Sequence, residues 1–292
     1  MNELDSGIAP PLPISLNVQQ RLLKVAYTPD ADDLVNFYAW EQDHIGMEGA
    51  RVSFNRGSII ALNRSCLTGT YDVAAISSAF YPRIASDYWI LSCGTSTGRG
   101  YGPVLAAREP MLRQQLRGKR IGVGGIVTTG SALASMYCPN AQLVEMRYDT
   151  IADAVLAGQL DAGVMIHEEL LHFTQTGLHR VCDLGATWCA ETGMPLPVGL
   201  NVVHKRVGYS LACQIDAACR TSLQWGLDHM DEALSFAGQF GRGCTQQFVG
   251  MFSNQDTLAM PNDVERALPV LFDRVAELGL GPKVDHCEVI RG

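Results

Sequence analysis

The sequence lacks any cluster of basic residues. Its 22 lysine and arginine residues are scattered among 30 aspartate and glutamate residues, and the formal net charge at pH 7 is −8. Proteins that bind nucleic acids neutralise phosphates with grouped lysines and arginines. We therefore expect no nucleic-acid partner for this chain.

Long apolar runs are also missing. A membrane-spanning helix needs about 20 consecutive apolar residues, and no stretch of this chain approaches that length. Residues 1–20 contain no lysine or arginine, so they lack the basic start of a secretory signal peptide. We expect a cytoplasmic protein without a membrane partner, and we interpret the proline-containing residues 1–20 as a disordered leader.

Cysteine motifs are absent although cysteine itself is not. The chain has nine cysteines, an odd number, and no two of them form a CxxC pair. A zinc ribbon or a thioredoxin-like redox motif would require such pairs. The pattern is typical of reduced thiols in a reducing compartment.

What the chain does contain is an alternation of strand and helix patterns. Short apolar runs such as 22–27 and 120–123 indicate buried strands, and helical patterns lie between them. This alternation predicts an α/β fold with open sheets and right-handed crossovers. Residues 106–204 have strands and helices of their own, so we predict a smaller lobe of 106–204 and a larger lobe of 21–105 plus 205–292. A ligand cleft is expected between the two lobes.

Small or polar segments follow several of the predicted strands. In open α/β sheets, ligands bind beyond the carboxyl ends of the strands. The segments in this position are residues 28–33, Ser77 with Ser78, residues 124–130, and His167 with Glu168. We expect them to lie around one cleft. Asp30, with Asp33 three residues later, also fits the capping pattern of a helix that begins there.

Residues 124–130 combine glycines with two hydroxyls at a predicted helix start. Free backbone N–H groups at such a position can bind an anion. No lysine follows the glycines, as a Walker A loop requires, and the GxGxxG spacing of a dinucleotide fold is absent. Thr128 and Thr129 are therefore candidates for ligand contact, although capping the helix is the more common role of threonine here.

His167 stands at the end of a predicted strand. The unperturbed pKa of a histidine side chain, about 6.5, suits a general base near neutral pH. The alternative is a structural histidine, and position alone favours neither. Glu168 could orient the imidazole or face solvent. His167 and Glu168 are not part of an HExxH motif and no third ligand is evident, so we expect no metal site.

Arg99 lies in the glycine-rich segment 94–103. A guanidinium group there could bind a ligand carboxylate. The alternative is a hinge loop between the lobes with Arg99 in solvent.

Several of these segments carry a family pattern. DAGVMIHE at 161–168 and TGMPLPVG at 192–199 resemble the 1,4-dihydroxy-6-naphthoate synthase family of the futalosine pathway to menaquinone. GRGYGP at 98–103 and the pair Thr128-Thr129 look like that family too. The similarity spans about residues 24–280, and the part from Asp161 to Gly199 is its most specific.

The resemblance implies a type II periplasmic-binding-protein fold used as a cytosolic enzyme without a metal or organic cofactor. The family converts cyclic dehypoxanthinyl futalosine to 1,4-dihydroxy-6-naphthoate and releases a sugar-derived fragment. We therefore expect a lyase-type enzyme with a small-molecule substrate. We expect it to be a monomer or a homodimer. His167 matches the family's catalytic base. With the family positions that line the pocket (Asn63, Ser77 and Thr129), our predicted substrate-binding residues are Asp30, Asp32, Asn63, Ser77, Ser78, Arg99, Thr128 and Thr129.

The first loop departs from the family pattern. The family reads Ser-Pro-Cys-Pro-Asn-Asp-Thr where this chain has residues 28–34, so Asp30 replaces a cysteine and Asp32 an asparagine. Ala75 stands where the family has a lysine, and TSTG at 95–98 replaces Gly-Ala-Leu-Gly. Carboxylates are gained and an ammonium is lost, which should weaken binding of a carboxylate-bearing substrate through like-charge repulsion.

These departures leave other functions open. A divergent paralogue could act on another aromatic or bicyclic molecule, either neutral or amine-bearing. The chain could also be a cytosolic binding protein of the same fold without catalysis. A chorismate-dehydratase-like or thiamine-pyrimidine-type protein is a further reading, and the long match after Asp161 favours the naphthoate synthase over it.

Overall fold

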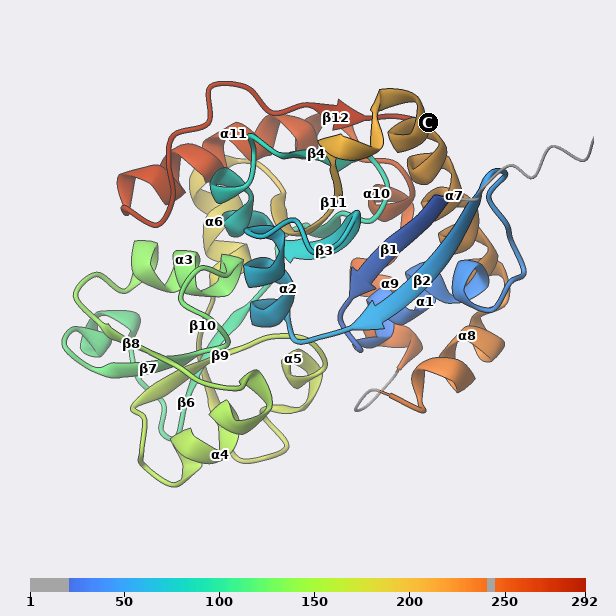
Figure 1. Cartoon of the computed structure of the whole chain (residues 1–292). Helices are drawn as coiled ribbons and strands as arrows, with labels where there is room; N and C mark the ends of the chain where they lie inside the picture. Colours follow the sequence, from blue (N-terminus) through green and yellow to red (C-terminus); the bar gives the residue numbers. More distant parts are fainter. Residues whose placement is uncertain (1–20, 241–244) are drawn as a thin grey trace, which may run out of the picture.

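The computed structural model describes residues 21–240 and 245–292, so the predicted leader, residues 1–20, lies outside the described residues. The described chain forms two α/β lobes, each built around its own sheet (Figure 1). The smaller lobe, green in Figure 1, lies beneath the larger one in that view.

The larger lobe contains a seven-stranded sheet with the order β12-β4-β11-β3-β1-β2, and β5 also pairs with β11. Strands β1, β2 and β3 are parallel, whereas β11 runs antiparallel to β3 in the middle of the sheet. The strand bounds are β1 Arg21–Tyr27, β2 Ala50–Arg56, β3 Val73–Ser77, β4 Tyr88–Leu91, β5 Ser96–Gly98, β11 Leu196–His204 and β12 Val289–Ile290.

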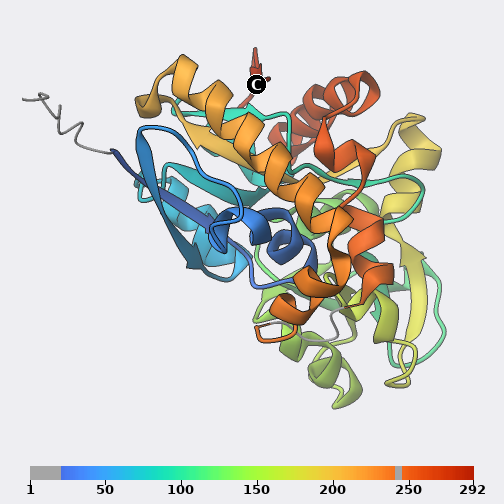
Figure 2. The same cartoon turned by 90° about the vertical axis from the view of Figure 1, so that its right-hand side faces the viewer.

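Helices cover this sheet and close packing joins two of them. Helix α7 crosses the lobe in Figure 2 and packs on α1. A Cβ atom at Gly226 of α7 would lie 2.4 Å from the carbonyl oxygen of Val35 in α1, so only glycine permits this approach. The helices are α1 Ala31–Glu41, α2 Ile59–Cys66, α7 Tyr209–Asp228, α8 Met230–Ala237, α9 Gln246–Phe252, α10 Gln255–Leu258 and α11 Asn262–Glu277, with 3-10 helices η1 Ser78–Arg83 and η4 Lys205–Val207.

The smaller lobe contains a five-stranded sheet with the order β10-β6-β9-β7-β8. Its strands are β6 Val104–Ala107, β7 Arg120–Val123, β8 Gln142–Glu145, β9 Ala162–Met165 and β10 His179–Asp183. Its helices are α3 Thr129–Tyr137, α4 Ile151–Leu156, α5 Glu169–His172 and α6 Leu184–Thr192, with 3-10 helices η2 Arg113–Leu116 and η3 Tyr148–Thr150.

The predicted boundaries of the smaller lobe, 106–204, do not match the sheets. Strand β6 starts at Val104, and β11, which we predicted in the smaller lobe, pairs with β3 and β4 of the larger one. The apolar pattern of β11 indicates a buried strand, but such a pattern does not specify which sheet the strand joins. The chain therefore crosses between the lobes after β5 and again before β11.

One cluster of buried apolar side chains extends through both lobes. It joins Ile76 and Leu200 of the larger sheet to Val123 and Val164 of the smaller one. The two lobes therefore share one apolar core. No helix in residues 21–240 and 245–292 is long and apolar enough to cross a membrane.

Candidate functional site

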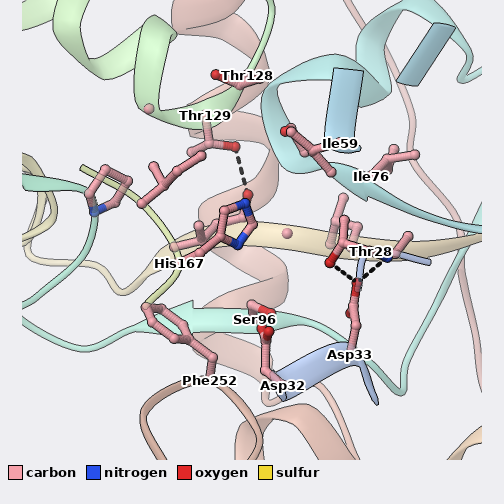
Figure 3. Close-up of a pocket in the computed structure, with 18 of the residues that line it drawn as sticks. Thr28, Asp32, Asp33, Ile59, Ile76, Ser96, Thr128, Thr129, His167 and Phe252 are labelled. Atoms are coloured by element: carbon pink, nitrogen blue, oxygen red, sulfur yellow. Dashed lines mark hydrogen bonds between the residues drawn. The ribbon is translucent and has the colours of Figure 1, made fainter. Parts of the chain in front are cut away.

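A cavity of about 100 Å³ lies between the lobes. The ends of β1, β3 and β9 and the start of α3 contribute polar groups to it, namely Thr28, Ser77, His167, Thr128 and Thr129. Figure 3 shows Thr28, His167, Thr128 and Thr129 around the cavity. Apolar side chains such as Ile76, Ile166, Val198, Phe248 and Phe252 form much of the remaining wall. The structure therefore brings together the four strand-end segments singled out in the sequence.

His167 is held at one ring nitrogen and open at the other. Its Nδ1 atom lies 3.0 Å from a carboxylate oxygen of Asp30. Its Nε2 atom is buried and has no hydrogen-bond partner among the described residues. The backbone of His167 has a φ of 54°, a left-handed conformation that is uncommon outside glycine and is concentrated at functional sites.

Asp30 connects the two lobes through its side chain. One carboxylate oxygen faces His167, and the other accepts a hydrogen bond of 3.1 Å from the hydroxyl of Tyr148. Asp30 occupies the N-cap position of α1 but its side chain does not cap the helix, contrary to our prediction. A carboxylate beside Nδ1 favours the tautomer that carries its proton there, so Nε2 is left as a proton acceptor.

Two more carboxyls lie beside the cavity. Asp33 accepts hydrogen bonds from the backbone N–H and the hydroxyl of Thr28, at 2.9 and 2.7 Å (Figure 3). These bonds favour the charged form of Asp33, but burial outweighs them and raises its pKa to about 6. Burial also raises the pKa of Asp32 well above its usual range, and the neighbouring carboxyl of Asp33 raises it further.

Glu168 reaches from the smaller lobe to the start of α1. Its Oε1 atom accepts a hydrogen bond of 3.1 Å from the backbone N–H of Ala31. Burial raises the pKa of Glu168, and the charge of Asp30 adds to this shift. Glu168 therefore contacts the larger lobe rather than the solvent.

The two predicted threonines use their hydroxyls within the protein. Thr128 caps α3, since its Oγ1 accepts a hydrogen bond from the Ser131 N–H at 3.3 Å. The Thr129 hydroxyl donates to the carbonyl of Val198 at 2.7 Å and accepts from the N–H of Ala79 at 3.2 Å. Both residues line the cavity. The predicted ligand contacts of the two threonines remain predictions.

Asn63 and Ser78 lie behind the cavity wall. The Asn63 carboxamide accepts from the N–H of Ser77 at 3.1 Å and donates to the carbonyl of Val127 at 3.3 Å. It thereby joins α2 of the larger lobe to the loop before α3. Ser78 is completely buried and is not among the residues that line the cavity.

No group of three or more histidine, cysteine, aspartate or glutamate side chains in the described parts of the chain is arranged to hold a metal ion.

Comparison with known proteins identifies the family. A family model described as menaquinone biosynthesis matches residues 23–277. The chain belongs to this menaquinone-biosynthesis family. A similar protein is the 1,4-dihydroxy-6-naphthoate synthase of Thermus thermophilus, which is 32% identical over 262 residues, 88% of this chain and 95% of the relative. The resemblance noted in the sequence is thereby confirmed, and it supports an enzyme of menaquinone biosynthesis.

Solved structures establish the fold of this family member. A crystal structure of an Archaeoglobus fulgidus protein is 34% identical and has a TM-score of 0.85, covering 90% of this chain and 99% of that protein. The periplasmic aliphatic sulphonate binding protein SsuA from Escherichia coli is 11% identical, with a TM-score of 0.67, covering 91% of this chain and 90% of that one. The predicted two-lobed, periplasmic-binding-protein-like fold is therefore confirmed.

Arg99 of this menaquinone-biosynthesis protein lies outside the cavity, contrary to its predicted role. Its guanidinium donates hydrogen bonds of 2.6–3.2 Å to Asp256 of α10 and Asp263 of α11. The guanidinium is exposed, in agreement with the alternative, but it is paired there with these two carboxylates. Both partners lie more than 150 positions further along the chain, so the sequence did not reveal this pairing.

Tyr148 and Asn201 belong to the site of this family member but were not among the predicted site residues. The Tyr148 ring lies 4.6 Å from the His167 ring, centroid to centroid. Burial raises the pKa of Tyr148, and the carboxylate of Asp30 raises it further. Asn201 lines the cavity from the middle of β11. Its signal in the sequence was a single polar residue within the apolar run 200–203.

Proposed function

We propose that the protein is a lyase of the 1,4-dihydroxy-6-naphthoate synthase type, acting on a cyclic dehypoxanthinyl futalosine-like substrate without a metal or organic cofactor. In this function His167 is the general base. The observation that supports the proposal best is the asymmetry of its ring, in which Asp30 holds Nδ1 while Nε2 has no hydrogen-bond partner among the described residues.

The reaction would begin with proton transfer to His167. The lone pair of Nε2 takes a proton from a substrate carbon, and the electrons of that C–H bond form a carbon–carbon double bond. The bond from the adjacent carbon to its oxygen substituent breaks, and the oxygen leaves with that electron pair, which opens the ring. The imidazolium that forms is stabilised by the Asp30 carboxylate, and it can return its proton to the departing oxygen.

The walls of the cavity favour this chemistry. Apolar side chains from both lobes surround the base, so water competes less for the proton and electrostatic interactions are stronger than in solvent. The contacts of Asp30 and Glu168 across the lobes hold the base and its partner together only when the lobes are closed.

A second candidate function follows from the charges of the cavity. Its lining includes Asp32 and Asp33, and no lysine or arginine is among the described residues that line it. A divergent paralogue with a neutral or amine-bearing aromatic or bicyclic substrate fits these charges, as does a small-molecule-binding protein without catalysis.

The experiment that tests the enzyme is direct. Purified protein is incubated with cyclic dehypoxanthinyl futalosine, and 1,4-dihydroxy-6-naphthoate is measured by liquid chromatography and mass spectrometry. We expect product from the wild type. Absence of product from a folded protein would reject this substrate and favour the paralogue.

His167→Ala should lower kcat by a factor of about 10² or more, because the variant lacks the general base. Substrate binding, measured by calorimetry, should be largely retained. His172→Ala is the matched control, since His172 lies on α5 close in sequence but does not line the cavity. Turnover that survives in His167→Ala would show that His167 is structural.

A further inference from the structure

Asp32 and Asp33 are adjacent carboxyls of the cavity lining with different hydrogen-bonding environments. Asp33 accepts two hydrogen bonds from Thr28, which stabilise its charged form (Figure 3). Asp32 lacks such support. One of its oxygens is 3.4 Å from the Ser96 hydroxyl, and the other is buried without a partner among residues 21–240 and 245–292. A buried charge without donors is costly, so the surroundings of Asp32 suit a neutral carboxylic acid.

The charged groups that face Asp32 also favour its neutral form. Burial raises the pKa of Asp32, and the charges of Asp33, Asp30 and Glu168 raise it further. Among the described residues that line the cavity, His167 is the one basic side chain, and its Nδ1 atom lies beside Asp30. No lysine or arginine of that lining offsets the three neighbouring carboxyls.

A neutral Asp32 changes what this part of the cavity can bind. The side chain is half-buried and lines the cavity, so a ligand can reach it. A carboxylic acid offers one O–H donor and one carbonyl acceptor, whereas an ionised carboxylate only accepts and repels another anion. The asparagine of the family pattern at this position is likewise a neutral donor and acceptor. The like-charge repulsion expected from the sequence is then absent at Asp32.

We propose that Asp32 is a specificity-determining residue that binds a ligand carboxylate as a neutral acid. The O–H of Asp32 donates to an oxygen of the ligand carboxylate, and the charge of the acceptor strengthens this hydrogen bond. Binding and protonation are linked, because the bound anion favours the protonated acid and ionisation of Asp32 weakens binding of the anion. This inference rests on the proposed function in so far as that function supplies a bicyclic ligand with a carboxylate.

The test uses 2-naphthoate, a bicyclic carboxylate that does not itself titrate between about pH 7 and about pH 9. Its affinity is measured by isothermal titration calorimetry. At about pH 7 we expect Asp32→Asn, which keeps a neutral donor and acceptor, to bind within about threefold of the wild type. Asp32→Ala lacks the donor and should bind about tenfold more weakly or worse. An ionised Asp32 predicts the opposite sign, since both substitutions would then remove a like charge and raise the affinity.

The pH dependence of binding is a readout that a merely structural role would not change. Raising the pH from about 7 to about 9 ionises a larger fraction of Asp32, so the wild type should lose affinity for 2-naphthoate. Asp32→Asn should lose less. His167, Asp33, Asp30 and Glu168 are common to both proteins, so the difference between the two slopes belongs to Asp32.

Asp273→Asn is the matched control. Asp273 is exposed on α11 and is not among the residues that line the cavity, so this variant removes one carboxyl away from the site. It should bind 2-naphthoate as the wild type does at both pH values. If Asp32→Ala does not fold, Asp32→Asn is decisive alone, since tighter binding in this variant at about pH 7 would show that Asp32 is ionised.

The outcomes separate this inference from the proposed function. Unchanged or tighter binding by Asp32→Ala, equal pH dependence of the wild type and Asp32→Asn, or no binding of 2-naphthoate would each overturn the role of Asp32. Turnover of cyclic dehypoxanthinyl futalosine is scored independently. Turnover together with tighter binding by Asp32→Ala would retain the lyase and reject this role. The expected binding pattern without turnover would retain the role and reject the lyase.

Discussion

The two ring nitrogens of His167 have different surroundings, and the difference comes from a residue in the other lobe. Asp30 is 3% exposed and binds both the imidazole and the Tyr148 hydroxyl. A carboxylate in this position sets the tautomer of a histidine base and stabilises its protonated form during the reaction. Asp30 is thus a positioning residue, since it acts through His167.

Asp30→Asn tests this role. The asparagine keeps the shape of the side chain but removes the negative charge opposite the imidazolium, so we expect kcat to fall by about 10²-fold or more. KM should change little, because Asp30 is not among the residues that line the cavity. Steady-state kinetics with the family substrate make the measurement. A raised KM with an unchanged kcat would instead assign Asp30 to substrate binding.

At the scale of elements, much of the site could be predicted because strand ends are visible in the sequence. The runs before Thr28, Ser77 and His167 end where β1, β3 and β9 end or within two residues of that point, and the topology brings these ends together. Pairing between distant elements could not be predicted. The placement of β11 in the larger sheet and the carboxylate partner of His167 depend on contacts that no local pattern encodes.

Arg99 illustrates this limit and allows a prediction for the loop that carries it. Its ion pairs fasten this loop to α10 and α11 at the surface, where Arg99 is 45% exposed. Exposed pairs contribute little, so Arg99→Ala should lower the free energy of unfolding by about 0.5–1 kcal/mol in urea denaturation. KM should be unchanged because the guanidinium lies outside the cavity. A higher KM at unchanged stability would mean that Arg99 reaches the ligand.

At the scale of the whole molecule, carboxyls with raised pKa values gather at the cavity and at the contact between the lobes. The carboxyls of Asp32 and Asp33 are held in a site that raises their pKa values, and Glu168 adds a third raised carboxyl at the lobe contact. Burial in the folded protein therefore favours their protonated forms.

These raised pKa values predict how stability depends on pH. An unfolded aspartate has a pKa of about 3.9, whereas Asp33 in the fold has a pKa of about 6 and that of Asp32 is also raised. Over this window the folded state binds more protons than the unfolded chain, so the stability present below the unfolded pKa is lost as pH rises through the folded value. Urea unfolding at about pH 4.5 and pH 6.5 should show a smaller loss of stability in Asp32→Asn than in the wild type. Equal losses would contradict the raised pKa of Asp32.

The pairing of β5 with β11 has a consequence for how the two lobes are connected. Because Gly98 pairs with Leu196, the chain leaves the larger lobe and re-enters it at adjacent positions. His167 lies in the segment between these two positions, whereas Asp30 lies in the larger lobe. The two connections therefore lie side by side like one hinge, and a rotation of the lobes about them would separate the base from the carboxylate that orients it.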